Sequence, residues 1–230
     1  MAVVRPFRAV RPDPARVDLG TIVADAALTR AALAVALDRD PRHLGQLLFV
    51  DDPRAIAFAV TDLLRAGVLV KDAVPSLTVV RVVGDDGERT FFFGALRADS
   101  VDVDSVADEV DAAVPDIVAA PVVVAFADKK GRIVRAMEAE TEREPDAAFT
   151  VAGAAIEVWV VDDDSAAARL ASLVEGASLS VVAGAEVLAR QRARGTAEQP
   201  SWALGCFVDE ERPAGFLPVG VCMVPASNAV

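Results

Sequence analysis

The chain has 230 residues, of which 53% are hydrophobic and 25% are charged, and this composition excludes an intrinsically disordered protein. Its 35 acidic and 23 basic residues give a net charge of -12, which repels a phosphate backbone and argues against a nucleic-acid partner. A compact domain of this length buries roughly 70% of the surface of its unfolded chain, so a core of ordinary stability is expected.

The first third of the chain combines an extended N-terminus with two predicted helices. Prolines disfavour helix over residues 1–20. Apolar residues at helical spacing predict a helix over residues 25–37, and a short apolar run predicts a strand over residues 46–50. Asp52-Pro53 is typical of a helix start, and Gly67 is typical of a helix end, so a second helix is predicted between them, followed by a strand to Lys71.

The middle of the chain carries hairpin signals. Strands are predicted over residues 77–83 and 89–96, because a Gly-Asp-Asp-Gly turn separates two runs of strand-forming residues. Phe91, Phe92 and Phe93 put aromatic side chains on both faces of the second strand, which indicates a central place in a sheet. A helix is predicted near residues 106–114, and a second hairpin is predicted over residues 122–137.

Residues 137–147 are expected to be exposed and mobile, because four glutamates follow one another at alternate positions (Glu138, Glu140, Glu142 and Glu144). This stretch could divide the chain into residues 1–137 and 148–230, near 138–147. Strands are predicted again directly after it, so a single domain over residues 1–230 is the favoured organisation.

The C-terminal third alternates strands and helices. The predicted elements are strand 156–161, helix 165–175, strand 179–182, helix 185–194, strand 202–208 and strand 216–223. Together with the hairpin-rich middle, they predict an α+β fold, built on a mixed, partly antiparallel sheet with flanking helices.

The cysteines and the chain ends bear on location and partners. Cys206 and Cys222 have no nearby cysteine or histidine, which is typical of reduced thiols in a cytoplasmic protein. Charge and proline interrupt the N-terminus before a signal-peptide core could form, and prolines and glycines interrupt the apolar stretch 213–230. We therefore expect no membrane or nucleic-acid partner, and expect instead a protein partner or self-association.

Few residues offer catalytic chemistry. No phosphate-binding loop, metalloprotease or serine-hydrolase pattern occurs, His43 is the one histidine, and no cofactor is expected. Asp162, Asp163 and Asp164 lie between a predicted strand and a predicted helix. The helix dipole alone favours acids there, and a metal site is the alternative interpretation.

The turn at Gly184 is the candidate ligand site. It leads from a predicted strand into a predicted helix, whose first backbone N–H groups could hold an anion. Glu186, two residues later, would repel a phosphate. The candidate ligand-binding residues are Gly184, Ala185 and Glu186.

Four segments, in order, resemble the domain-of-unknown-function family numbered ten-fifteen. They are the opening MAVVRPFRAVRPD, then LLRAGVLVKD with a following PSL, then VWVVD, and finally FLPV. The resemblance covers most of the chain, although typical members are considerably longer. It implies kinship with ParB-like proteins and free-serine kinases, in which an Asp-Gly-His-His-Arg motif at a strand–helix turn serves nucleotide binding and phosphotransfer.

This chain departs from that motif at every position except its glycine. The glycine falls on Gly184, while the acid falls on Ala183, the two histidines on Ala185 and Glu186, and the arginine on Val187. The resemblance thus implies a degenerate member, a pseudoenzyme that binds a partner protein or a small ligand. The alternative is a small-molecule (amino-acid) phosphotransferase with relocated groups, which would use Glu186 and Asp162–Asp164 with a metal.

Overall fold

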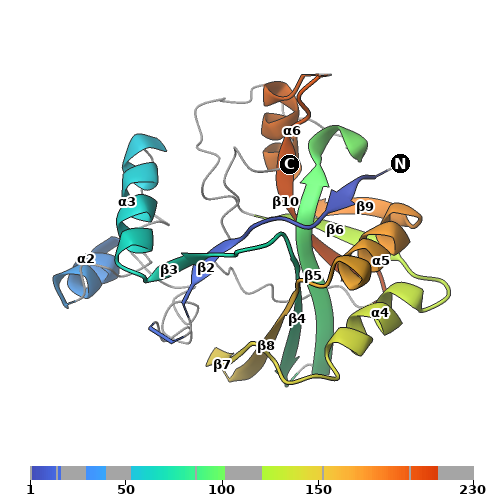
Figure 1. Ribbon diagram of the computed structural model, residues 1–230, viewed down its shortest axis with the longest axis horizontal. Helices are drawn as coiled ribbons and strands as arrows, with labels where there is room; N and C mark the ends of the chain where they lie inside the picture. The colour runs from blue at the N-terminus through green and yellow to red at the C-terminus, as the bar shows by residue number, and fades with distance from the viewer. Residues whose placement is uncertain are drawn as a thin grey trace.

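The fold is built around one eight-stranded sheet (Figure 1). The computed structural model describes residues 2–13, 15–16, 30–39, 53–85, 87–101, 121–151, 153–196 and 198–211. The strands of the sheet are β1 (Val4–Arg5), β4 (Leu77–Gly84), β5 (Gly87–Arg97), β6 (Val122–Ala127), β7 (Ala147–Val151), β8 (Ala154–Val161), β9 (Ser178–Ala183) and β10 (Trp202–Asp209).

Strand pairing makes this sheet mixed and mostly antiparallel. Its order is β7-β8-β4-β5-β10-β6-β9, and β1 pairs with the end of β5 beyond β4. Only the β10–β6 pair of the described sheet is parallel. Helices flank the sheet, so the predicted α+β fold class is confirmed.

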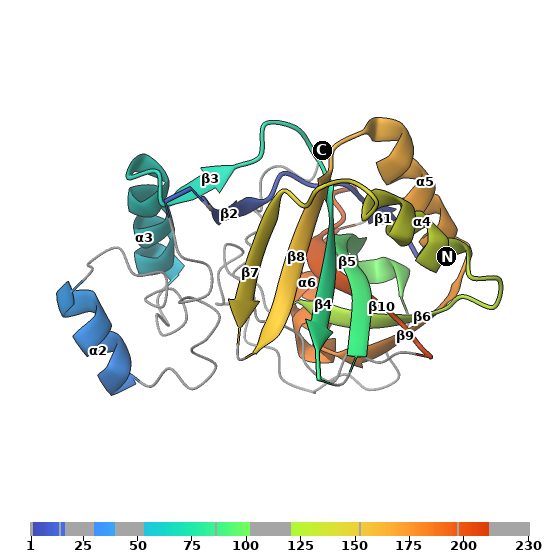
Figure 2. The ribbon, with the colours of Figure 1, turned by 90° about the horizontal axis from the view of Figure 1, so that it is seen from below.

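Three helices pack against the sheet, and two others lie away from it, beyond a separate two-stranded ribbon (Figures 1 and 2). The first group is α4 (Arg132–Glu140), α5 (Asp164–Glu175) and α6 (Ala185–Arg194), and a short 3-10 helix, η2 (Ala98–Ser100), follows β5. The ribbon consists of β2 (Val10–Pro12) and β3 (Leu69–Lys71), and the helices on its side are α2 (Arg30–Arg39) and α3 (Pro53–Arg65). Figures 1 and 2 show α2 and α3 on the far side of the ribbon from the sheet.

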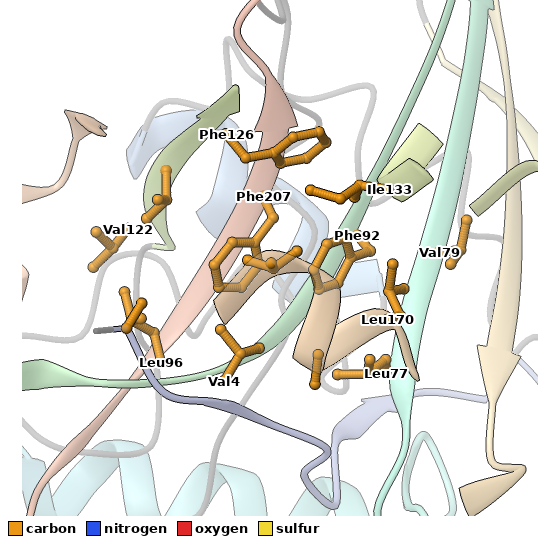
Figure 3. Packing of buried hydrophobic residues seen from close by; sticks show 14 of the residues in the cluster. Val4, Leu77, Val79, Phe92, Leu96, Val122, Phe126, Ile133, Leu170 and Phe207 are labelled. Carbon is orange, nitrogen blue, oxygen red and sulfur yellow. The ribbon is translucent and has the colours of Figure 1, made fainter. Parts of the chain in front are cut away.

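The β4–β5 hairpin forms the middle of the sheet, as predicted. Phe92 points to the face covered by α4, α5 and α6, where its ring stacks on Phe207 with centroids 4.7 Å apart (Figure 3). Phe91 and Phe93 point to the opposite face and meet edge to face at 5.7 Å. Burying aromatic rings on both faces accounts for the central position of β5, between β4 and β10.

The larger core lies between the sheet and these three helices. Ile133 of α4, Leu170 of α5 and Leu188 of α6 are buried in one cluster with Phe92 and Phe126 of the sheet. The three helices are amphipathic, and each places its apolar stripe on this cluster. The sheet and the helices therefore bury one common apolar layer, which Figure 3 shows from close by.

The predicted second hairpin is wrong, because residues 132–140 form α4. The Asp128 carboxylate accepts hydrogen bonds from the N–H groups of Arg132, Ile133 and Val134, at 2.9, 2.6 and 3.0 Å. Such bonds satisfy the donors that begin a helix, so the acid that resembled a hairpin turn residue caps a helix instead.

The acidic stretch 137–147 is only partly exposed. Met137 is 1% exposed, and residues 138–140 continue α4, while Glu138, Glu142 and Glu144 face solvent. Strands from both sides of this stretch belong to one sheet, with β4, β5 and β6 before it and β7 and β8 after it.

Other predicted elements agree where they are described. α3 begins at Pro53, buries Val60 and Leu63, and is followed by Gly67 at φ 71°. The first predicted helix is described as α2 over residues 30–39, where Val35 is 54% exposed. None of the described helices combines the length and hydropathy that a membrane span needs.

Several predictions fall outside the described residues. These are the strands at 46–50 and 216–223, the helix at 106–114, Asp52, His43 and Cys222.

Candidate functional site

The Gly184 turn links β9 to α6 as the sequence predicts. Gly184 has a φ of 81°, a left-handed conformation that side chains disfavour. A Cβ atom at this position would lie 3.0 Å from the carbonyl oxygen of Pro121 and 3.0 Å from the Cα of Val122. Both neighbours are backbone atoms that cannot rotate away, so conformation and close packing each require glycine here.

The side chains around this turn are small, acidic or buried. Ala183 and Glu186 are exposed and Ala185 is half-buried, whereas Val187 is 6% exposed and belongs to the core. The carbonyl oxygen of Gly184 accepts hydrogen bonds from the N–H groups of Val187 and Leu188. Among the candidate residues of this turn, Glu186 is thus the one that offers a charged side chain to solvent.

α6 is held in place beyond the turn. Arg192, in its last turn, donates a hydrogen bond from Nε to the carbonyl oxygen of Ala98 at 2.6 Å. Before the turn, the β6–β9 register shifts between Val123 and Val124, and Val182 is left 59% exposed. Such an irregularity bends a strand and locally interrupts its pairing, so β9 reaches the turn by a bent path.

A second feature is a hollow of about 630 Å³ between the β2–β3 ribbon and the end of β8. Arg11, Asp13 and Val70 line it from the ribbon side. The opposite side consists of Glu140, Arg143, Asp146, Val160, Val161, Asp162 and Asp163. Two of the three aspartates singled out from the sequence therefore face this hollow.

Arg143 and Asp146 form a hydrogen-bonded ion pair in the hollow. Two guanidinium nitrogens donate to the two carboxylate oxygens at 3.1 and 2.9 Å, and the N–H of Val160 donates to Asp146 at 2.6 Å. Burial acts to raise the pKa of Asp146, but the hydrogen bonds from Arg143 and Val160 outweigh it and lower the pKa. The hydrogen bond to Asp146 raises the pKa of Arg143.

Both arginines of the hollow are already paired within the chain. Arg11 donates from Nε to Asp72 at 2.7 Å, and Arg143 also donates to the carbonyl oxygen of Val160 at 2.9 Å. The indole N–H of Trp159 donates to the carbonyl oxygen of Arg143. These contacts hold the 141–146 turn against β8.

The three consecutive aspartates have separate surroundings. Asp163 is the N-cap of α5 and accepts a hydrogen bond from the N–H of Ala166 at 2.8 Å, and Asp164 is the first residue of the helix. Within the described ranges, no three His, Cys, Asp or Glu side chains come close enough together to hold a metal ion.

Glu186 does not join these aspartates. β8 and β9 are five strand positions apart in the sheet, roughly 24 Å at the usual strand spacing. Glu186 is not among the residues that line the hollow.

Sequence reasoning did not single out Arg143 and Asp146. Their signal is the three-residue spacing of an arginine and an aspartate before a strand, which is too common to indicate a site by itself. Comparison of the chain with family models, with curated proteins and with solved structures finds no match in any of the three. The family resemblance described above therefore depends on its four segments alone.

Proposed function

We propose that this protein is a non-catalytic, degenerate homologue of the nucleotide-handling family described above, and that it acts in the cytoplasm by binding a partner protein or a small ligand. The observation that carries the proposal is the composition of the Gly184 turn. The strand, the glycine and the helix are present, while the aligned reactive positions hold Ala183, Ala185, Glu186 and the buried Val187.

Val187 gives this proposal its strongest physical support. An arginine at the start of a helix can bind phosphate through its guanidinium group. Here that position points into the core, where a charged side chain would lose its hydration without a partner. Under this proposal the turn retains its glycine between a strand and a helix, and position 187 serves packing in the core.

Nucleotide titration by calorimetry tests this proposal. We expect no heat of binding from ATP or ADP with Mg²⁺ at millimolar nucleotide, and no phosphoryl transfer to serine. Micromolar ATP affinity together with phosphoryl transfer would contradict the proposal.

A rebuilt turn provides a sharper test of the kinship. The triple variant A183D/A185H/E186H restores three of the motif's side chains at positions where the backbone is exposed or half-buried. We expect this variant to gain measurable nucleotide binding that the parent lacks. The triple variant keeps the net charge of the parent, because A183D adds one carboxylate while E186H removes another. The single variant E186H is the control, because a gain seen equally in E186H would come from removal of the Glu186 carboxylate and not from the rebuilt motif.

The alternative is a phosphotransferase with relocated groups at Glu186 and Asp162–Asp164. The hollow that contains Asp162 and Asp163 favours it, whereas the five strand positions between β8 and β9 count against it. Under this alternative, E186A and D162N would each abolish an observable metal-dependent transfer activity. Activity retained in both variants would exclude it.

A further inference from the structure

The charges of α4 are arranged against its helix dipole. The basic end comprises Arg132 and Arg135 of the helix with Lys129 and Lys130 just before it. The acidic end comprises Glu138 of the helix with Glu142 and Glu144 just after it. The first turn of α4 contains no acid, and its last turn contains no base. Helices are stabilised by the opposite arrangement, so the charges nearest the two ends oppose the dipole of the isolated helix. The Asp128 carboxylate, which accepts the first N–H groups, is the favourable exception.

All seven side chains are exposed. None of its four cations forms a salt bridge with a carboxylate in the described part of the chain. Asp128, directly before Lys129, accepts hydrogen bonds from three backbone N–H groups, and Arg135 donates to the carbonyl oxygen of Lys130 at 2.7 Å. In a chain with a net charge of -12, a cluster of four unpaired cations is a distinct surface.

Geometry makes α4 accessible along its length. The helix lies at the outside of the molecule next to α5 in both ribbon views (Figures 1 and 2). Ala139, directly after Glu138, is exposed and small enough for another helix to approach closely. With nine residues the helix is roughly 13 Å long, so its two ends are separated by about one screening length at 0.1 M salt.

We propose that α4 is a self-association surface on which a second copy of this chain packs antiparallel. In such a two-fold pair, the basic end of each copy meets the acidic end of the other, and each contact occurs twice. The two helix dipoles also oppose one another. Each charged end of one chain then lies beside the oppositely charged end of the second chain. It also lies beside the end of the second helix whose dipole favours its charge.

This inference rests on the proposed function in one respect, because it names a second copy of the chain as the partner protein. The charge pattern around α4 does not depend on the Gly184 turn. The net charge of the chain repels a second copy, so the association is expected to be weak. Added salt weakens both that repulsion and the attraction between the basic and acidic ends. Charge substitutions therefore separate the two effects better than a change of salt concentration does.

Sedimentation equilibrium of the full chain and three variants tests the proposal. Variant one is K129E/K130E/R132E/R135E, variant two is E138K/E142K/E144K, and variant three combines both sets. We expect variants one and two to raise the dimer dissociation constant at least about tenfold each. Variant three, whose ends are exchanged but still complementary, is expected to return to within about threefold of the parent. A mixture of variants one and two is expected to form heterodimers.

Variant two excludes a trivial explanation. Each Glu→Lys change adds two positive charges, so the net charge moves from -12 to about -6 and general repulsion falls. A weaker dimer in this variant must therefore come from the lost contact between the ends. Circular dichroism verifies that each variant is folded.

Several results would overturn the proposal. A parent that stays monomeric at 0.5 mM protein, a dimer unaffected by variant two, or a failure of variant three to recover would each do so. Preferential binding of a polyglutamate peptide by a monomeric parent would assign the basic end to an acidic partner instead. Nucleotide binding in the calorimetric titration would contradict the proposed function without affecting any of these measurements.

Discussion

Replacing Gly184 by alanine is expected to destabilise the protein through two separable effects. The left-handed conformation at φ 81° costs an alanine about 1–2 kcal/mol. The new Cβ atom would also lie 3.0 Å from two backbone atoms, at Pro121 and Val122, and overpacking of this kind costs about 1–3 kcal/mol. We expect a total loss of roughly 2–4 kcal/mol, because part of the second cost is relieved by small shifts.

Gly153 is the matched control for this substitution. Its φ is 84°, nearly that of Gly184, but an added Cβ atom would meet nothing within 4 Å. Gly153→Ala is therefore expected to cost only the conformational share, about 1–2 kcal/mol. The difference between the two variants measures how tightly the Gly184 turn packs on residues 121–122.

Equilibrium unfolding in urea provides the measurement. Tryptophan fluorescence, which reports the fully buried Trp159 and the half-buried Trp202, and far-ultraviolet circular dichroism should give coincident transitions and hence a free energy of unfolding. If Gly184→Ala costs no more than Gly153→Ala, the turn does not pack closely on Pro121 and Val122, and close packing is not a reason for glycine at this position.

Three further substitutions test the structure away from this turn. Asp128→Ala removes the acceptor for three N–H groups of α4 and is expected to cost about 1–2 kcal/mol in urea unfolding, while Asp128→Asn should cost less. Asp146→Asn weakens the pairing with Arg143 and is expected to lower the free energy of unfolding. Because the pKa of Asp146 is lowered on folding, the difference in free energy of unfolding between wild type and variant should be complete above about pH 4 and shrink as the pH falls further. A difference that is unchanged down to pH 2 would contradict that pairing. Phe92→Ala removes the ring stacked on Phe207 and is expected to cost about 3–5 kcal/mol by the same assay, and a loss below about 1 kcal/mol would contradict the burial of this ring.

Local signals in the sequence were sufficient for many elements but not for their arrangement. The β4–β5 hairpin, the start of α3 at Pro53 and the Gly184 turn each depend on a few adjacent residues, and each was predicted. Sheet order depends on contacts between distant residues. The pairing of β4 with both β5 and β8, for example, follows from burial of Val79 between Phe92 and Trp159, and no local pattern specifies it.

The error at α4 has a specific physical cause. Two β-branched residues, Ile133 and Val134, favour a strand locally, and a Gly-containing turn precedes them. The competing signal is the helical spacing of Ile133, Ala136 and Met137, which are all buried. Packing of these three side chains on the core outweighs the weak intrinsic preference.

The hollow could not be predicted, because its two sides come from segments about 130 residues apart in the chain, near Arg11 and Arg143. The aspartates at 162–164 were correctly placed between a strand and a helix. Asp163 has the capping role that this position favours, since it accepts a hydrogen bond from the N–H of Ala166, whereas Asp162 faces the hollow and Asp164 is the first residue of α5.

The position of β10 has a consequence for how this protein is made. It is the last strand of the described chain, yet it lies between β5 and β6 and joins β7-β8-β4-β5 to β6-β9. On a translating ribosome, those two groups of strands are complete before residues 202–209 emerge, and they cannot form one sheet until then. The facing edges of β5 and β6 stay open during that interval. Premature termination before Trp202 would leave both edges exposed, so truncated chains should be prone to aggregation and rapid degradation.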